Sequence, residues 1–320
     1  MKTIWKLLLA VCLSAVANPG HAETLPVSAK TAGEQPLRFI FVTTCKDEAF
    51  FNPVKKGIAD AALLMNAKCE WTGTEDVDLP AQAIMVEAAI NSGCDGIAVD
   101  MIDPKAFNAV AALAEKKGIP LVSFNTDAPN ARLSTVAQNL YEAGVTAGQT
   151  AAGAIKSGSQ ILITKHSAGV SALDDRARGI QDALKKKKLK VTILITGTTA
   201  KQAAEKVTAA LKEKPGISAV LATGQADTEG AGLAVEQGFQ GKNIYIGGFD
   251  LSSETLRLIQ AGVISFTIDQ QPYIQGFYPV IQLALMSRYG IRPSSMDAGA
   301  AVITKATAGS VAKLCEQGYR

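Results

Sequence analysis

Residues 96–125 read GIAVDMIDPKAFNAVAALAEKKGIPLVSFN and contain a complete strand, helix and strand. The apolar runs 96–99 and 121–124 have the length of buried strands, and the stretch between them has the pattern of an amphipathic helix. Asp103 with Pro104 provides a cap and then a proline at the first helical turn, and Gly118-Ile119-Pro120 ends the helix before the next strand. The segment therefore predicts two neighbouring parallel strands joined by a helix.

Short apolar runs and amphipathic stretches alternate on both sides of this unit as well, which indicates parallel sheets covered by helices. A short run at 134–136 enters a new helix without a full strand and helix of its own, so we interpret 134–140 as a crossover. The prediction is an α/β protein with two doubly wound parallel-sheet lobes joined by a three-segment hinge, near 136–139, 270–271 and 297–301. The predicted lobes are 37–137 plus 271–297, and 138–270 plus 298–320. The predicted strands are 37–43, 69–72, 96–99, 121–124, 160–164, 191–196, 219–222, 244–247 and 265–268.

The first 22 residues have the organisation of a secretory signal peptide. Lysines lie near the start, 7–17 is an apolar run, and Gly20-His21-Ala22 is a small-x-small cleavage site. An uncleaved membrane anchor is the alternative, but the run is well short of the roughly 20 residues that span a bilayer. A lipid attachment site at Cys12 is a second alternative, although Val11 precedes it where a small residue is needed. We expect cleavage after Ala22 and a periplasmic location.

The charge of the chain argues against nucleic-acid binding, and its cysteines leave disulfide formation open. The chain has 32 basic and 29 acidic residues, a net charge of +3, which gives no electrostatic footprint for nucleic acid. The lysines at 185–188 and 190 end a predicted helix, where cations suit the helix dipole. Four cysteines follow the leader, and none is spaced as Cys-x-x-Cys, so a disulfide and its pairing stay open. They are Cys45, Cys69, Cys94 and Cys315.

Polar side chains gather where the predicted strands end, which is where open parallel sheets bind ligands. Carboxylates and amides accept and donate hydrogen bonds to hydroxyl groups, and aromatic rings pack on the apolar face of a sugar. One such residue alone would be a helix cap or turn, but the whole set favours a sugar or polyol site. The set comprises 44–47, Phe50-Phe51-Asn52, Asp100, 125–127, His166, 225–227, Asp250 and 269–270.

From Leu37 to about Lys305 the chain resembles the type I periplasmic binding proteins of the ribose and galactose class. The resemblance is carried by Phe50-Phe51 with Gly57, by Asp95-Gly96-Ile97 and by Gly118-Ile119-Pro120 before 121–125. Its most specific motifs are Gly247-Gly248-Phe249-Asp250 and Thr267-Ile268-Asp269-Gln270-Gln271-Pro272-Tyr273. The resemblance implies a periplasmic binding protein-like I fold and the substrate-binding component of an ABC transporter, a monomer that closes around a sugar or polyol and delivers it to a membrane permease.

The resemblance also implies roles for single residues. Phe50 and Phe51 would stack on the sugar, with Asp47 or Lys46 reaching the ligand from the same loop. Asn125 stands where the ribose binders have aspartate, Thr126 where they have arginine, and Ala226 where they have asparagine, with Asp227 beside it. These departures argue for a ligand other than ribose. Arg176, Asp250 and Gln270 match the family, and the predicted ligand-binding set is Lys46, Asp47, Phe50, Phe51, Asp100, Asn125, Asp127, Arg176, Asp227, Asp250 and Gln270.

Structural roles compete with these assignments. Phe50 and Phe51 would also suit an ordinary core, Arg176 a surface ion pair, and Asp227 or Asp250 a helix cap. His166, the one histidine after the leader, is interpreted as a loop residue.

Catalytic motifs for metal, serine, phosphate-loop or dinucleotide chemistry are missing from the sequence, so neither enzyme activity, nor a cofactor, nor a metal is expected. A hydrolase that uses two carboxylates is the enzymatic alternative. A repressor on the same scaffold would carry a DNA-binding segment where the leader lies. A sensory binding protein that presents the ligand to a chemoreceptor or sensor kinase is the alternative to transport.

Overall fold

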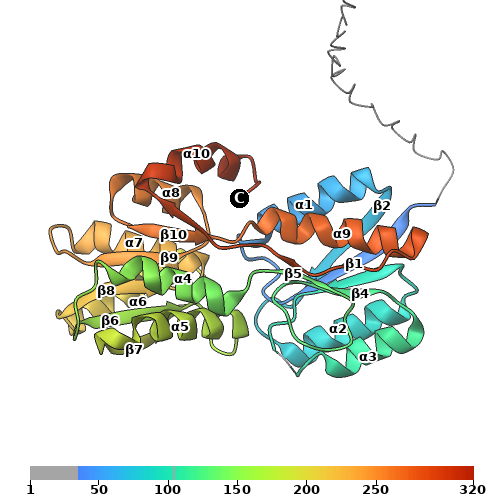
Figure 1. Cartoon of the computed structure of the whole chain (residues 1–320), viewed down its shortest axis with the longest axis horizontal. Coiled ribbons are helices and arrows are strands. Elements are labelled where there is room, and N and C mark those ends of the chain that lie inside the picture. The colour runs from blue at the N-terminus through green and yellow to red at the C-terminus, as the bar shows by residue number, and fades with distance from the viewer. Residues whose placement is uncertain (1–34, 104) are drawn as a thin grey trace, which may run out of the picture. The chain divides into compact units, whose positions relative to one another are not determined.

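The computed structural model describes residues 35–103 and 105–320. The predicted signal peptide, the alternative lipid site at Cys12, and Pro104 lie outside the described residues. Within the described part, the strands form two six-stranded sheets (Figure 1). No helix in this part of the chain is long and apolar enough to cross a membrane.

The first sheet has the strand order β11-β5-β4-β3-β1-β2, and its neighbouring strands pair in parallel. Helices α1 (Phe51–Leu64) and α9 (Pro272–Tyr289) cover one face, and α2 (Leu79–Asn91) and α3 (Asn108–Lys117) cover the other. The strands are β1 (Leu37–Thr43), β2 (Ala67–Gly73), β3 (Gly96–Val99), β4 (Leu121–Asn125), β5 (Thr135–Ala137) and β11 (Met296–Asp297).

Strand β1, which lies between β3 and β2, shows why the sequence forms this layer. Its residues Phe39 and Phe41 pack with α1 and α9, while Ile40 and Val42 pack with α2 and α3. A parallel strand between two helical layers needs apolar side chains on both faces, so it has a continuous apolar run. The buried run in β1 therefore fixes a three-layer arrangement.

The second sheet has the order β12-β10-β9-β8-β6-β7, with β12 antiparallel to β10 and the other neighbours parallel. Helices α4 (Leu140–Ala152) and α5 (Ser171–Leu184) cover one face, and four helices pack on the other. Those four are α6 (Ala200–Glu213), α7 (Gln225–Gly238), α8 (Ser253–Ala261) and α10 (Lys305–Glu316). The strands are β6 (Gln160–Lys165), β7 (Lys190–Ile195), β8 (Ile217–Ala222), β9 (Tyr245–Phe249), β10 (Phe266–Asp269) and β12 (Ala301–Thr304).

The chain passes between the two sheets three times, after β5, after β10 and between β11 and β12. The three crossing segments are hydrogen-bonded to one another. The Ala298 N–H donates to the Ala137 carbonyl at 2.9 Å, and the Gln271 side chain donates to the Ala298 carbonyl at 2.8 Å. Gln138 adds a third link, because its Nε2 donates to the Gly299 carbonyl at 2.8 Å.

Helix α9 returns to the first sheet after β10 and lies beside α1 (Figure 1). Two glycines allow this close approach. A Cβ on Gly276 would lie 2.0 Å from the Val54 carbonyl oxygen, and one on Gly57 would lie 2.1 Å from the Tyr273 carbonyl oxygen. Backbone atoms cannot yield to such contacts, so the crossing depends on glycine at both positions.

The predicted fold class, two α/β parallel-sheet lobes, is confirmed by this topology. Each of the nine predicted strands is present, with ends that differ by a few residues. One helix start was wrong, because α3 begins at Asn108 rather than at Pro104. The Asp103 carboxylate instead accepts hydrogen bonds from the N–H groups of Lys105 and Ala106, so it caps a turn before the helix.

Candidate functional site

A cavity of about 470 Å³ is bounded by residues of both sheets, at the carboxyl ends of their parallel strands. The first sheet contributes the loops after β1, β3 and β4, and the second contributes the loops after β6, β8, β9 and β10 together with α5. Of the eleven residues predicted to bind ligand, eight line this cavity. They are Asp47, Phe50, Phe51, Asp100, Asn125, Arg176, Asp250 and Gln270.

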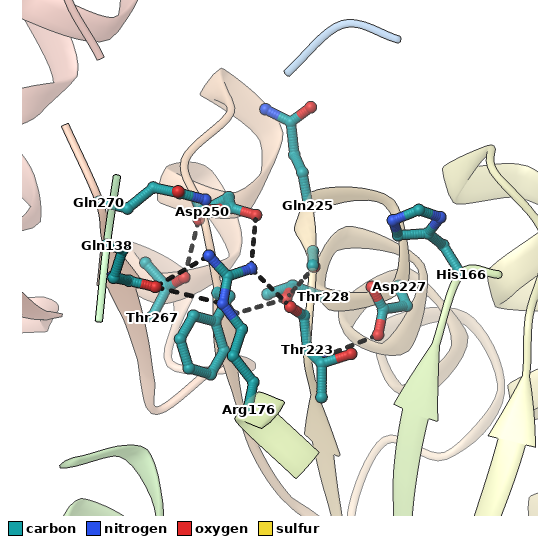
Figure 2. Close-up of polar contacts among 12 residues, drawn as sticks. Gln138, His166, Arg176, Thr223, Gln225, Asp227, Thr228, Asp250, Thr267 and Gln270 are labelled. Atoms are coloured by element: carbon teal, nitrogen blue, oxygen red, sulfur yellow. Dashed lines mark hydrogen bonds and ion pairs between the residues drawn. The ribbon is translucent and has the colours of Figure 1, made fainter. Parts of the chain in front are cut away.

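Arg176 is the buried cation of the cavity (Figure 2). Its Nε and Nη2 donate to the Gln138 side-chain oxygen at 3.2 and 2.9 Å, and its Nη1 donates to the Thr223 carbonyl at 2.8 Å. The guanidinium also lies over the Phe249 ring, 4.4 Å from its centroid. These contacts fix a planar donor group in one orientation at the wall of the cavity.

Asp250 follows β9 directly and faces Arg176 (Figure 2). Its Oδ2 lies 3.7 Å from Arg176 Nη1, and its Oδ1 accepts a hydrogen bond from Gln270 Nε2 at 2.5 Å. Burial raises the pKa of Asp250, and the charge of Arg176 acts in the opposite direction. The three side chains form a connected set of donors and acceptors on one side of the cavity.

Backbone conformation at three strand ends contributes to the site. Cys45, Asn125 and Asp250 have φ values of 48, 61 and 70°, in the left-handed region that residues other than glycine rarely adopt. Each lines the cavity. Such backbone strain is typical of functional sites, where the surrounding structure holds a residue in an unusual conformation.

Phe50 and Phe51 line the cavity and also belong to the core beside α1. Their rings meet edge to face, with centroids 5.2 Å apart, and Phe51 contacts Trp71 at the same centroid distance. Both the predicted cavity position and the alternative core role therefore hold for these rings. Phe50 is 9% exposed and Phe51 3%, so little of either ring is open to solvent.

Two residues of the predicted set are engaged away from the cavity. Lys46 pairs with Asp47, with 2.8 Å between Nζ and Oδ2, and its side chain does not line the cavity. Asp127 forms an ion pair with Arg132 and accepts a hydrogen bond from the Ser123 hydroxyl at 2.7 Å. The Arg132 pair explains why Asp127 is directed away from the cavity, whereas Lys46 is paired with a residue of the lining, Asp47.

Asp227 also lies outside the cavity lining, although its neighbours Gln225 and Ala226 contribute to it. Its Oδ2 accepts hydrogen bonds from the Thr164 hydroxyl at 2.7 Å and from the Thr223 N–H at 2.9 Å. Asp227 is fully buried and lies in the first turn of α7. Its carboxylate therefore ties β6 to the loop after β8, and the alternative role as a helix cap is not what it has, because the N-cap of α7 is Gly224.

Several cavity residues were not in the predicted set, among them Glu48, His166, Gln225 and Glu229. His166 and Gln225 both follow strand ends, which was the available signal, but His166 was interpreted as a loop residue. Burial lowers the pKa of His166 to about 4. Gln225 is fixed by a hydrogen bond from its Nε2 to the Leu251 carbonyl at 2.6 Å.

Buried carboxyl groups around the cavity have raised pKa values. Burial raises the pKa of Asp100 to about 7, although the Thr43 hydroxyl donates to this carboxylate at 3.1 Å and the Asn125 amide at 3.4 Å. Burial likewise raises the pKa of Asp227 to about 7. Both groups therefore bind protons more tightly in the folded protein than in the unfolded chain.

This difference predicts a pH dependence of stability that Asp100→Asn should remove. The pKa of Asp100 in the folded protein is raised above its value in the unfolded chain. The protonated carboxyl therefore contributes fully to the free energy of unfolding below about pH 4, and this contribution is lost as the pH rises through 7. Between pH 5 and 8, the wild type should lose roughly 1 to 3 kcal/mol of unfolding free energy relative to the variant. Denaturant titrations at several pH values measure this, and parallel curves for the two proteins would contradict it.

The four cysteines after the leader are free in the structure, so the open disulfide prediction finds no bonded pair there. Burial raises the pKa values of Cys45 and Cys69 to about 12, which keeps both as thiols. Among residues 35–103 and 105–320, no group of three or more His, Cys, Asp or Glu side chains is arranged to hold a metal ion.

Comparison with known proteins places this geometry in context. The model of a periplasmic binding protein domain matches residues 39–288. The chain is 32% identical over 285 residues to the xylose/arabinose-binding protein of Sulfolobus acidocaldarius, covering 83% of this chain and 71% of that protein. A solved carbohydrate transporter from Acidothermus cellulolyticus in complex with myo-inositol is 28% identical, with a TM-score of 0.80, over 89% of this chain and 100% of that chain. A glucose-galactose binding protein from Geobacillus stearothermophilus is 29% identical, with a TM-score of 0.76, over 85% and 99%.

Proposed function

Because the chain belongs to the periplasmic binding protein family, we propose that it is the substrate-binding component of an ABC-type importer and captures a sugar or sugar-like polyol in the cavity. Its relatives support this proposal, since they include a xylose/arabinose-binding protein, a ribose import binding protein and a D-allose-binding protein. The same family membership supports an extracytoplasmic location, and cleavage of the predicted leader after Ala22 stays a proposal that rests on the small-x-small motif at 20–22.

The cavity lining is the observation that carries the proposal. A sugar hydroxyl both donates and accepts, so it needs acceptors and donors within reach of one another. Asp250 and Asp100 supply acceptors, Arg176 supplies donors, and the amides of Asn125 and Gln270 serve either purpose. Phe50 supplies an apolar surface for ring carbons. The volume of about 470 Å³ lies within the usual range for small-molecule sites.

We further propose that binding proceeds by hinge closure at the three crossing segments, with lobes of residues 37–137 plus 271–297 and 138–270 plus 298–320. Arg176 connects the cavity to these segments, because its partner Gln138 donates to the Gly299 carbonyl at 2.8 Å. A ligand that orients Arg176 would thereby favour one arrangement of the crossing segments. The closed monomer would then dock on a membrane permease, and the ligand would leave chemically unchanged.

A thermal-shift screen of the processed protein against pentoses, hexoses and cyclitols tests the proposed function. A ligand that binds only the folded state at a hundred times its dissociation constant should stabilise the protein by about 2.7 kcal/mol. We expect a clear rise in melting temperature with one member of the panel, and a smaller radius of gyration by small-angle scattering with that ligand. A panel without any stabilising member would contradict sugar binding, and an unchanged radius would contradict closure.

A further inference from the structure

The cavity has more negative charge than its positive groups can balance. Six carboxylate side chains line it, against one guanidinium and one histidine, and within the described structure only one of the six, Asp47, is paired with a lysine, Lys46, that lies outside the lining. The histidine adds little positive charge at neutral pH, because burial lowers the pKa of His166 to about 4. An anionic ligand would meet repulsion in such a cavity. The six carboxylates belong to Asp47, Glu48, Glu75, Asp100, Glu229 and Asp250.

The one guanidinium is already committed to other groups (Figure 2). Arg176 donates three hydrogen bonds to Gln138 and Thr223, and its Nη1 lies 3.7 Å from Asp250 Oδ2. Its positive charge therefore compensates Asp250. The described structure records no ion pair between a lysine or arginine and either Glu48 or Asp100.

Glu48 and Asp100 are close enough for the negative charge of Asp100 to act on Glu48. Burial, and after it the charge of Asp100, raises the pKa of Glu48 to about 7. Glu48 Oε1 is buried and has no hydrogen-bond partner among the described residues, with His166 Nδ1 at 3.7 Å. That nitrogen is itself 3.0 Å from the Ser167 hydroxyl. The groups that act on Asp100 as hydrogen-bond donors are neutral: the Thr43 hydroxyl, the Asn125 amide, and the hydroxyl and backbone N–H of Thr126.

The hydroxyl of Thr126 gives independent evidence that a polar ligand group is needed here. Thr126 is 1% exposed and lines the cavity, and its Oγ1 makes no hydrogen bond of standard geometry among the described residues, although the hydroxyl acts on the nearby Asp100 carboxyl and lowers its pKa. Buried polar atoms are normally hydrogen-bonded, so an unsatisfied hydroxyl and an unsatisfied carboxylate oxygen in the lining of one cavity indicate that a polar partner is missing. A ligand with several polar groups would supply partners for both.

We infer that the ligand is a sugar or cyclitol that carries a protonated primary amine, and that Glu48 and Asp100 bind this ammonium group. The inference rests on the proposed function and specifies its ligand class. An ammonium group has three donors and no acceptor, which suits two carboxylates that lack a cation. It would supply the positive charge that buried carboxylates require, whereas a hydroxyl would supply only a neutral hydrogen bond.

Matched pairs of neutral and amino ligands test the inference by calorimetry at pH 7. The pairs are D-glucose with D-glucosamine, D-galactose with D-galactosamine, and myo-inositol with an aminodeoxy-inositol, each with its N-acetylated form. In the pair that fits the cavity, the amine should bind about tenfold or more tightly than its neutral parent, and N-acetylation should remove this advantage. Its affinity should also rise from pH 5.5 to 7.5, as the carboxyl groups lose their protons.

Two variants separate a specific role of Glu48 from a general effect of charge. Glu48→Gln should lower the affinity for the amine about tenfold or more and change the affinity for the neutral parent by no more than about threefold. Glu115→Gln makes the same chemical change at an exposed position on α3, outside the cavity lining, and should leave both affinities unchanged. Equal losses for amine and parent in Glu48→Gln would overturn the assignment of Glu48.

The possible failures are distinguishable. If a neutral sugar binds and its amine binds more weakly in every pair, the amine inference is wrong and sugar binding stands. If no amine binds while the thermal-shift screen finds a neutral pentose, hexose or cyclitol that does, the inference alone fails. If neither set of ligands contains a binder, the proposed function fails and the inference fails with it.

Discussion

Arg176→Met is expected to lower the free energy of unfolding by about 3 to 5 kcal/mol and to abolish measurable ligand binding. The substitution keeps an apolar stem over Phe249 but removes the donors to Gln138 and Thr223. It also leaves the buried Asp250 carboxylate without its positive partner. Breaking a buried pair by removing one partner is costly, because the remaining charge stays desolvated. Urea titration and calorimetry measure the two effects.

Arg178→Met is the matched control for this variant. Arg178 lies on the same helix, its side chain is 60% exposed, and it pairs with Asp175 at 2.9 Å. Exposed pairs of this kind contribute about 1 kcal/mol or less, so both stability and affinity should change little. If Arg176→Met is no more destabilising than Arg178→Met, the buried network does not have the energetic role described above.

Asp250→Asn is expected to weaken ligand binding about ten- to a hundredfold while the fold is retained. Asparagine keeps an oxygen that can accept from Gln270 Nε2, but it removes the charged acceptor beside Arg176. Loss of a charge-assisted hydrogen bond costs about 1.5 to 3 kcal/mol, which corresponds to this loss of affinity. Calorimetry with the ligand found in the thermal-shift screen measures the change.

Asp127→Asn separates the cavity site from a general effect of removing a carboxylate. Asp127 was in the predicted set, but its carboxylate pairs with Arg132 and lies outside the cavity lining. Its substitution should leave ligand affinity within about twofold of the wild type, since only contacts with the ligand carry binding energy. Equal losses in Asp127→Asn and Asp250→Asn would contradict the site as drawn here.

The fold could be predicted from the sequence because the patterns that indicate its strands and helices are local and repeated along the chain. Runs such as 96–99 and 121–124 are apolar on both faces, so their pattern is that of buried parallel strands. Strands β11 and β12 were not predicted, because they have two and four residues and depend on pairing with β5 and β10. The start of α3 was misplaced because Asp103 caps a turn as readily as a helix.

The site was predictable to the level of loops and less so to the level of side chains. Strand ends placed Asp100, Asn125 and Asp250 correctly in the cavity lining, since each follows or ends a strand. Within longer loops, the direction of a side chain depends on tertiary partners that are distant in sequence. Asp227 turns to Thr164, which is 63 residues away along the chain, while the unpredicted Glu48 faces the cavity.

A crystal structure of the protein with the tightest ligand from the screen would show directly whether this cavity is the binding site. We predict a single ligand molecule in the cavity, with its oxygen atoms within hydrogen-bond distance of Asp250 and Arg176 and with its ring carbons against Phe50. A ligand bound at another surface, or one inside the cavity without a polar contact to either charged residue, would contradict the claim that this cavity is the binding site.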